Sequence, residues 1–472
     1  MNATSSLLPA QRLDTAGQSH IDYAALARLA WPLILNSALQ SVLSLTDTWF
    51  IGRLSTAAVA AIGATYLLIH TVIFFVGGVA LGVQTLVAQA YGARDTARAA
   101  GVVWTGLWMV LITAPFFFGL AQFGAVVLAP FGLEPEIQSL AVDYWLPRLL
   151  GSPFAVATWV LVGFFSGIGR TRVTLVVTVT VALVNAVLNP LFMFGFGWHI
   201  AGSAWATTVA QVLGVGLALA YFLGQRTRLE FRSHQTWRPR AAALRQLLML
   251  GVPMGLSAMA DIAATAVFQL MLVSLGAVQG AASQIVLQLT SLAYMPGLGI
   301  AMAGTTLVGQ AIGAGAREWA LRLGNGVIRA VILVMGVISV GLAVCGPWLA
   351  PLFIAPSDPQ AAIVGALAVK LLWIGAAYQV FDGLNIGSSL CLRGAGDSRV
   401  PALVMIGLAW FGWVPLTHVL TFSSGEGWLG LLPHYGQGAV GGWFALTLYV
   451  FAAGMLLNWR WRSRVWQGIN LH

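Results

Sequence analysis

The sequence predicts an all-α integral membrane protein with twelve transmembrane helices, arranged as two six-helix bundles related by a pseudo-twofold axis. Three observations support this prediction: the composition, the number of long apolar runs and an internal repeat. Hydrophobic residues make up 59% of the 472 residues and charged residues only 8%, whereas soluble proteins carry about 25% charged residues. A chain this apolar must have lipid as its main solvent.

Twelve apolar runs are long enough to cross a bilayer, which requires about 20 residues. The polar segment before the first run lacks the short apolar core of a signal peptide, so this run is expected to be an uncleaved anchor. The runs cover residues 28–51, 58–90, 100–125, 139–166, 173–197, 200–224, 245–275, 281–312, 322–350, 361–391, 400–422 and 439–459.

Arginines mark one side of the predicted membrane. They lie before the first run, in every second loop and after the last run, whereas the other side has little beyond Arg53 and Lys370, with Arg148 inside the fourth run. Because cytoplasmic loops carry an excess of Lys and Arg, both termini are expected in the cytoplasm. The net charge of +9 therefore reflects orientation in a lipid bilayer, and we predict no nucleic-acid partner.

An internal repeat divides the chain into two halves. The segment "TLVAQAYGA" at 85–93 returns 221 positions later as "TLVGQAIGA", and "GIGRTRVT" at 167–174 returns 227 positions later as "GAGDSRVP". An even number of spans per copy predicts parallel repeats, related by an axis along the membrane normal with a central cavity between them. The predicted domains are a cytoplasmic segment 1–24, an N-lobe 25–226, an Arg-rich linker 227–243 and a C-lobe 244–466.

Common enzyme motifs are missing from the sequence. The single lysine, Lys370, follows Val369, so no phosphate-binding loop ending in G-K-[ST] exists, and there is no H-E-x-x-H zinc motif. We therefore predict no catalytic residues, no enzymatic activity and no cofactor. Transport, lipid flipping or a structural role remain.

Four acids lie within the spans: Asp47, Asp143, Asp261 and Asp382. An aspartate at mid-membrane costs about 2.5–3.5 kcal/mol on insertion scales. Asp143 starts a span and is expected at the interface. The other three have no Arg or Lys expected at their depth, so they must be protonated, bind a metal cation or bind a cationic substrate.

Polar residues accompany these acids. Asn185 and Asn189 are four positions apart and share a helix face, as do Tyr378 and Asp382. Such oxygen donors suit a hard cation or a proton relay. Gln40 and Gln284 are weaker candidates, because a glutamine between helices often serves packing.

The sequence resembles the multidrug and toxic compound extrusion (MATE) transporters of the MOP type, from about residue 24 to 460, and is most similar to their NorM-like branch. The resemblance rests on "LAWPLILNSALQSVLSLTDTWFIGRLSTAAVAAIGA" at 29–64, "VAQAYGARD" at 87–95, "VNAVLNPLFMFG" at 184–195, "GSAWATTVAQ" at 202–211, "LGVPMGLSAMAD" at 250–261 and "YQVFDGLNIGSSLCLRGAGDSRVP" at 378–401.

The resemblance implies a monomer in the bacterial inner membrane that exports organic cations in exchange for Na⁺ or H⁺ through a central cleft. It implies two groups of site residues. Asp47, Asn185, Asn189 and Thr207 form an N-lobe site for protons or substrate. Asp382, Asp261 and Tyr378 form the cation-coupling site, with Asp382 and Asp261 as metal ligands if the ion is Na⁺, and Gln284 and Gln40 are further lining residues.

Two positions depart from the family pattern. Asp261 stands where the NorM-like branch usually has Glu, and Asn189 stands where another branch often has an acid. The main alternative function is a lipid-linked oligosaccharide flippase of a related fold, whose anionic cargo would favour deep cationic residues. The sequence leaves the coupling ion and the natural substrate open.

Overall fold

A computed structural model describes residues 8–15, 17–354, 359–425, 427–428 and 433–469. Its described residues form twelve helices that are long and apolar enough to cross a membrane, as predicted. They are α1 (Tyr23–Gly52), α2 (Thr56–Gly92), α3 (Thr96–Gln122), α5 (Pro135–Gly167), α6 (Thr171–Pro190), α7 (His199–Leu223), α9 (Ala241–Ser274), α10 (Ala277–Gly313), α11 (Arg317–Val344), α13 (Ala361–Gly394), α14 (Arg399–Leu408) continuing into α15 (Val414–Thr421), and α16 (Gly438–Arg462).

Shorter elements connect these helices. Three of them are short helical turns of 3-10 type, and two are π-helical turns that extend α6 and join α14 to α15. The short elements are β1 (Gln11–Leu13), β2 (Ser19–Ile21), α4 (Gly124–Leu128), α8 (Gln225–Phe231), α12 (Gly346–Leu349), the 3-10 turns Ala129–Phe131, Ala350–Phe353 and Val465–Gly468, and the π turns Leu191–Gly195 and Ala409–Trp413.

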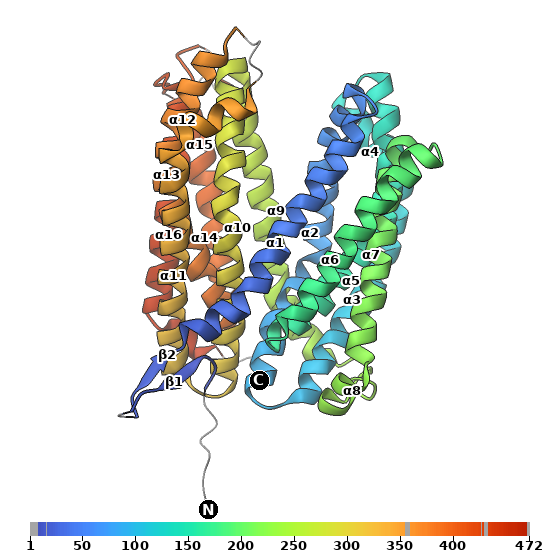
Figure 1. The fold of residues 1–472 in the computed structure, drawn as a ribbon, viewed down its shortest axis with the longest axis vertical. Helices are drawn as coiled ribbons and strands as arrows, with labels where there is room; N and C mark the ends of the chain where they lie inside the picture. Colours follow the sequence, from blue (N-terminus) through green and yellow to red (C-terminus); the bar gives the residue numbers. More distant parts are fainter. Residues whose placement is uncertain (1–7, 16, 355–358, 426, 429–432, 470–472) are drawn as a thin grey trace, which may run out of the picture.

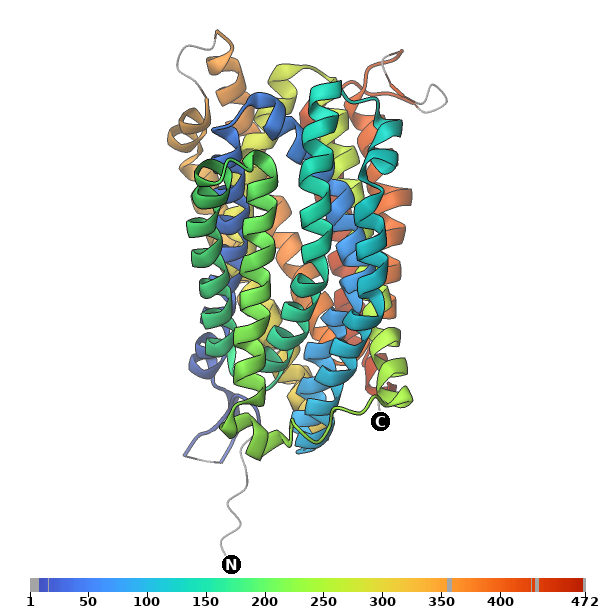
Figure 2. The same cartoon turned by 90° about the vertical axis from the view of Figure 1, so that its right-hand side faces the viewer.

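The helices form two bundles, one from each half of the chain. Figure 1 shows α1 to α7 in blue to green on the right and α9 to α16 in yellow to red on the left, and Figure 2 shows the first bundle from its outer side. The bundles meet at the end where both termini lie and diverge toward the other end. We call these the arginine-rich end and the far end.

The first helix of each repeat packs into the opposite bundle at the arginine-rich end. Leu26, Ala30 and Leu33 of α1 belong to the hydrophobic core of the second bundle, and Leu247 and Leu250 of α9 belong to that of the first. Leu26 and Leu247 are 221 positions apart, so the crossing is the same in both repeats. Each bundle is therefore completed by a helix from the other half of the chain.

Glycines bring the crossing helices into backbone contact. A Cβ atom added to Gly78 of α2 would lie 2.3 Å from the Cα of Gly255 on α9, and one added to Gly299 of α10 would lie 2.6 Å from the backbone nitrogen of Ile34 on α1. These pairs are again related by 221 positions. Only glycine allows helix axes to approach this closely.

Two buried glutamines complete the contact with reciprocal hydrogen bonds. Gln89 of α2 donates to the Gly394 carbonyl across the interface, at 3.0 Å, and Gln310 of α10 donates to the Gly167 carbonyl, at 2.8 Å. All four residues belong to the segments that repeat in the sequence. The predicted pseudo-twofold relation is thus confirmed residue by residue, and the arginine-rich end is where the two bundles are bonded together.

One element was not expected from the sequence. The polar segment before α1 forms an antiparallel β-hairpin in which Arg12 pairs with His20, and Trp319 of α11 donates its indole N–H to the Pro9 carbonyl. The hairpin therefore docks on the second bundle, the same bundle that the start of α1 enters.

A first prediction concerns the glycine contact. Gly78→Ala should lower the free energy of unfolding by about 1–3 kcal/mol, because the new methyl group overpacks the interface. Gly63→Ala is the matched control on the same helix, since a Cβ there meets nothing within 4 Å, and it should be neutral or stabilising by up to about 1 kcal/mol. Unfolding in mixed micelles measures both, and equal effects would contradict the contact.

Candidate functional site

The first candidate site surrounds Asp47, between α1, α6 and α7. Asn189 donates its side-chain N–H to one carboxylate oxygen at 2.8 Å, and the Thr207 hydroxyl donates to the other at 3.2 Å. Asn185 donates to the Thr207 hydroxyl at 3.0 Å and accepts from Asn189 at 3.1 Å. The structure thus joins all four predicted N-lobe residues in one hydrogen-bonded cluster.

The end of α6 positions the two asparagines. Asn185 and Asn189 share the buried face of the helix and have no exposed area, as their spacing predicts. Pro190 has no N–H to continue the helical pattern, and the helix widens into the π turn Leu191–Gly195, a feature that often accompanies functional sites. The side-chain oxygen of Asn189 is buried without a hydrogen-bond partner among the described residues.

Arg148 corrects an expectation from the sequence. The prediction that the deep acids have no cation near them is wrong for Asp47, because Arg148 of α5 lies close enough for the two charges to attract. Arg148 follows Asp143 by five positions within the same span, and Asp143, which is expected at the interface, is exposed. The attraction offsets part of the cost of placing the Asp47 charge among helices.

The second candidate site surrounds Asp382 on α13, which is 5% exposed. Asn385 donates its side-chain N–H to one carboxylate oxygen at 3.2 Å, and the Tyr378 hydroxyl lies 3.4 Å from the other. The side-chain oxygen of Asn385 is buried and has no partner among the described residues. Both sites therefore contain an asparagine that donates to the carboxylate while its own oxygen is left available.

Asp261 lies near this second site. It is exposed on α9, the helix of the second bundle that borders the first in Figure 1. Its charge interacts with that of Asp382, as predicted for the pair, and also with Arg393 at the end of α13. The expectation of no nearby cation is therefore wrong for Asp261 as well.

Two tyrosines lie near the second site and were not identified as site residues from the sequence. Tyr294 of α10 and Tyr449 of α16 both lie within electrostatic range of Asp382 and Asp261. Nothing in the sequence around either tyrosine signals this, because both reach the site from other helices. Asn385 had a usable signal, since it follows Asp382 by three positions and so shares its helix face.

Gln40 and Gln284 are not part of either cluster. Both side chains are exposed, and neither makes a side-chain hydrogen bond to the acids in the described part of the chain. A direct role at the carboxylates is thus unsupported for these two residues, and lining of the space between the bundles stays a prediction.

The donor atoms favour a hard ion over a transition metal. Within the described residues no three His, Cys, Asp or Glu side chains come together as a metal site. Carboxylate, amide and hydroxyl oxygens at Asp382, Asn385 and Tyr378 are the ligands that hard cations prefer, and the same groups can hold a proton. These residues therefore fit either Na⁺ or H⁺ as the transported ion.

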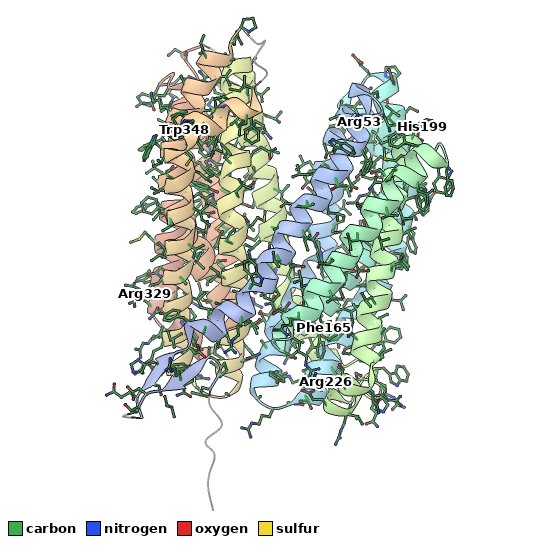
Figure 3. All side chains as sticks on the ribbon, viewed as in Figure 1. Arg53, Phe165, His199, Arg226, Arg329 and Trp348 are labelled. Carbon is green, nitrogen blue, oxygen red and sulfur yellow. The ribbon has the colours of Figure 1, made fainter. Side chains whose placement is uncertain are left out.

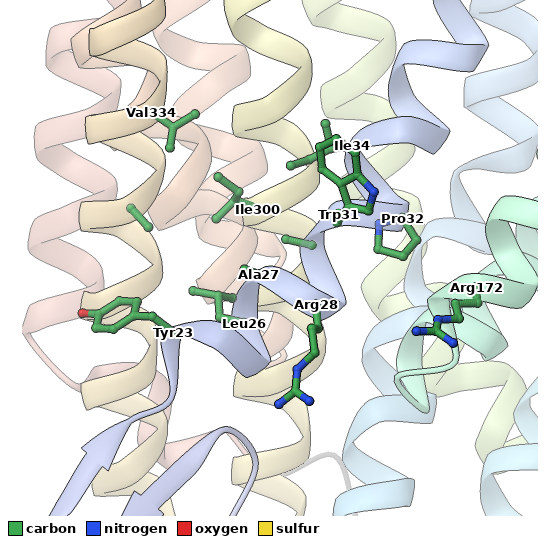
Figure 4. A pocket seen from close by; sticks show the side chains of 12 residues that line it. Tyr23, Leu26, Ala27, Arg28, Trp31, Pro32, Ile34, Arg172, Ile300 and Val334 are labelled. Carbon is green, nitrogen blue, oxygen red and sulfur yellow. The ribbon is translucent and has the colours of Figure 1, made fainter.

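A pocket of about 610 Å³ lies apart from both carboxylate sites. Figure 4 shows it beside the lower part of α1, with Trp31, Pro32 and Ile300 on its walls and Arg28 and Arg172 nearest the arginine-rich end. Its lining is largely apolar and includes none of the four membrane acids. It is therefore separate from both carboxylate sites and lies between α1, α6, α10 and α11.

The fold and the sites define a polytopic transporter-like membrane protein of two pseudo-symmetric bundles, each with a carboxylate held among polar side chains. A family model described as MatE matches residues 32–191 and 253–416, one segment in each bundle. The chain belongs to the multidrug and toxic compound extrusion family, in its NorM-like branch. Membership in a transporter family favours transport over enzymatic chemistry.

Relatives of known name cover nearly the whole chain. A probable multidrug resistance protein NorM from Rhizobium meliloti (strain 1021) is 31% identical over 98% of this chain and 97% of its own length. One from Agrobacterium fabrum is 30% identical over 92% of each. A solved MOP superfamily transporter from Pyrococcus furiosus has a TM-score of 0.82 at 21% identity, covering 93% of this chain and 95% of that one, and so shares the fold.

A second prediction tests the hydrogen-bonded cluster. Asp47→Asn and Asn189→Ala, made singly and together, should show a coupling free energy of about 0.6–1.7 kcal/mol, the range found for polar contacts within membranes. The cycle pairing Asp143→Asn with Asn189→Ala should show none, because Asp143 is exposed. Unfolding in mixed micelles measures both cycles, and equal coupling in the two would contradict the direct bond.

Proposed function

We propose that this protein is a multidrug efflux transporter that exports small organic cations in exchange for Na⁺ or H⁺. The observation that supports this most strongly is the buried Asp382, held by Asn385 and Tyr378 at mid-helix, in a chain whose relatives are described as probable multidrug resistance proteins. A carboxylate at this depth is costly unless it binds something.

The second site is assigned to the coupling ion. Asp382 and Asp261 repel each other when both are charged, and this repulsion grows in a medium of low dielectric constant. A bound Na⁺ or H⁺ relieves it, and the available oxygen of Asn385 supplies a further ligand for Na⁺. In this assignment Asp261, one methylene shorter than the usual glutamate, sets the distance at which the pair can share the ion.

The first site is assigned to protons or substrate. Asp47 is held by two donors and attracted by Arg148, so less of its charge is available to bind a small metal ion. A larger organic cation, or a proton exchanged on Asp47, suits this environment better. The two bundles would then divide the work between substrate and ion.

The shape of the molecule supports the proposal of alternating access. The bundles are bonded at the arginine-rich end and diverge at the far end (Figure 1). If both termini lie in the cytoplasm of a bacterial inner membrane, as we propose, this is the arrangement expected of an outward-open transporter. The predicted N-lobe, linker and C-lobe remain part of the proposal. One elementary charge moving through 100 mV supplies about 2.3 kcal/mol, which sustains roughly fiftyfold accumulation.

The flippase alternative is not favoured. Arg148 and Arg393 do remove the argument that no cation lies deep in the protein. However, each arginine lies within electrostatic range of an aspartate, and the relatives are described as probable multidrug resistance proteins.

The proposed function is tested with the purified protein in proteoliposomes. Ethidium efflux should follow either an imposed Na⁺ gradient or an imposed pH gradient, and the ion that drives it is the coupling ion. Absence of efflux under both gradients, with protein that is folded and inserted, would refute cation-coupled transport of organic cations.

A further prediction assigns the coupling to one residue. Asp382→Asn should lower the initial rate of ion-driven efflux by at least about tenfold, roughly 1.4 kcal/mol of lost driving interaction, because the neutral amide cannot hold the ion. Asp143→Asn removes the same charge from an exposed position and should leave the rate within about twofold. Ion-driven efflux by the Asp382→Asn variant at the rate of the unaltered protein would contradict the assignment of Asp382 to ion coupling.

A further inference from the structure

A polar pocket of about 400 Å³ lies in the second bundle, between α11, α13 and α16. Three arginines line it: Arg329 from α11, Arg462 from the last turn of α16, and Arg464 just beyond that helix. Figure 3 shows Arg329 on the outer side of the bundle, away from the first bundle. The pocket is thus separate from both carboxylate sites and faces the surroundings of the protein.

The charges in this pocket are not balanced. Arg464 forms an ion pair with Glu318 at 2.8 Å, whereas Arg329 and Arg462 form no ion pair with a described residue. Three positive charges against one negative leave a net charge of about +2 in the pocket, counted from these four groups. Such a concentration of guanidinium groups is the usual receptor for a phosphate.

The walls of the pocket are held in place. Asn325 accepts a hydrogen bond from the Trp461 indole N–H at 3.0 Å, and Asn458 donates to the Ser388 hydroxyl at 3.3 Å. Asn325 and Asn458 both line the pocket. The arginines on α11 and α16 therefore belong to helices that these hydrogen bonds hold in place, rather than to a mobile surface loop.

The position along the helices matches the level of lipid headgroups. The uncharged run of α11 ends at Arg329, and that of α16 ends at Arg460, so both helices are expected to leave the hydrocarbon near the height of the pocket. Ile332 and Leu384 continue the pocket wall on the apolar side. A phosphate at the arginines would thus have an apolar surface beside it for an acyl chain.

We propose that this pocket binds the phosphate of an anionic phospholipid in the leaflet at the arginine-rich end. The guanidinium groups of Arg329 and Arg462 bind the phosphodiester, and Ile332 and Leu384 contact the start of an acyl chain. A free phosphate ion shares the first interaction but not the second, and basic pockets between membrane helices are known receptors for anionic headgroups in general.

The test uses the full-length protein in detergent, with binding followed by native mass spectrometry. Phosphatidylglycerol should bind about 25-fold more tightly than phosphatidylcholine with the same acyl chains, at about fivefold for each of the two arginines. In Arg329→Gln/Arg462→Gln the ratio should fall to about twofold or less. Arg329→Lys/Arg462→Lys should keep most of the preference, because the charge is retained.

The matched control is Arg226→Gln/Arg228→Gln, which removes two exposed arginines of α8, the short helix at the same end of the first bundle (Figure 1). It should keep the preference of the unaltered protein. Equal loss of the phosphatidylglycerol preference in both glutamine variants, or no preference in the unaltered protein, would contradict lipid binding at this pocket. Displacement of phosphatidylglycerol by an equal concentration of glycerol 3-phosphate would make it a site for free phosphate and overturn the lipid assignment.

Discussion

The close backbone contact between the bundles at the arginine-rich end is the constraint on which the rest of the structure depends. In lipid no hydrophobic force drives helices together, so association relies on close packing and interhelical hydrogen bonds. Gly78 against Gly255 supplies the packing, and Gln89 and Gln310 supply the bonds. Because each contact occurs twice about the pseudo-twofold axis, the bundles can separate there only by breaking both copies together.

The symmetry of the scaffold does not extend to the sites. The position that corresponds to Asp47 in the second repeat is Phe268, which is buried and lies against Trp413 and Trp443. The position that corresponds to Asp382 in the first repeat is Ala155. One scaffold is therefore used twice, with a hydrogen-bonded carboxylate beside an arginine in one bundle and a repelling pair of carboxylates in the other.

The sequence predicted the features that depend on local pattern. Helix number and approximate limits follow from apolar run length. The equivalence of Gln89 and Gln310 follows from the repeated segments that contain them. The cluster of Asn185 and Asn189 with Asp47 was also foreseeable, because two of its members share a helix face.

Features that depend on contacts between distant helices were not predictable. The entry of α1 into the opposite bundle places Leu26 in a core built mainly from residues between Ile300 and Trp466, far away along the chain. Arg148 lies inside the fourth predicted span and Arg393 just beyond the tenth, yet each lies within electrostatic range of an aspartate on another helix. The sequence of a span indicates how deep a residue lies in the membrane but not which neighbouring helix its side chain approaches. An opposite charge on another helix therefore cannot be recognised from the local sequence.

The placement of these arginines connects the sites to the contact between the bundles. Helix α13 carries Asp382 near its middle and Arg393, which interacts with Asp261, near its end. The next residue, Gly394, accepts the hydrogen bond from Gln89. Twelve residues of helix, about 18 Å, join Asp382 to this carbonyl. An α-helix is stiff over this length, so a cation that changes the tilt of α13 at Asp382 also changes the geometry of the Gln89 bond.

The first bundle repeats this arrangement on α5. Arg148 interacts with Asp47, and Gly167 at the end of the same helix accepts the bond from Gln310. Each site is thus linked by one continuous helix to one of the two hydrogen bonds that hold the arginine-rich end closed. In the proposed transport cycle the two bonds break together, so occupancy of either site would bias the same opening, which is the physical requirement for exchanging one ligand against the other.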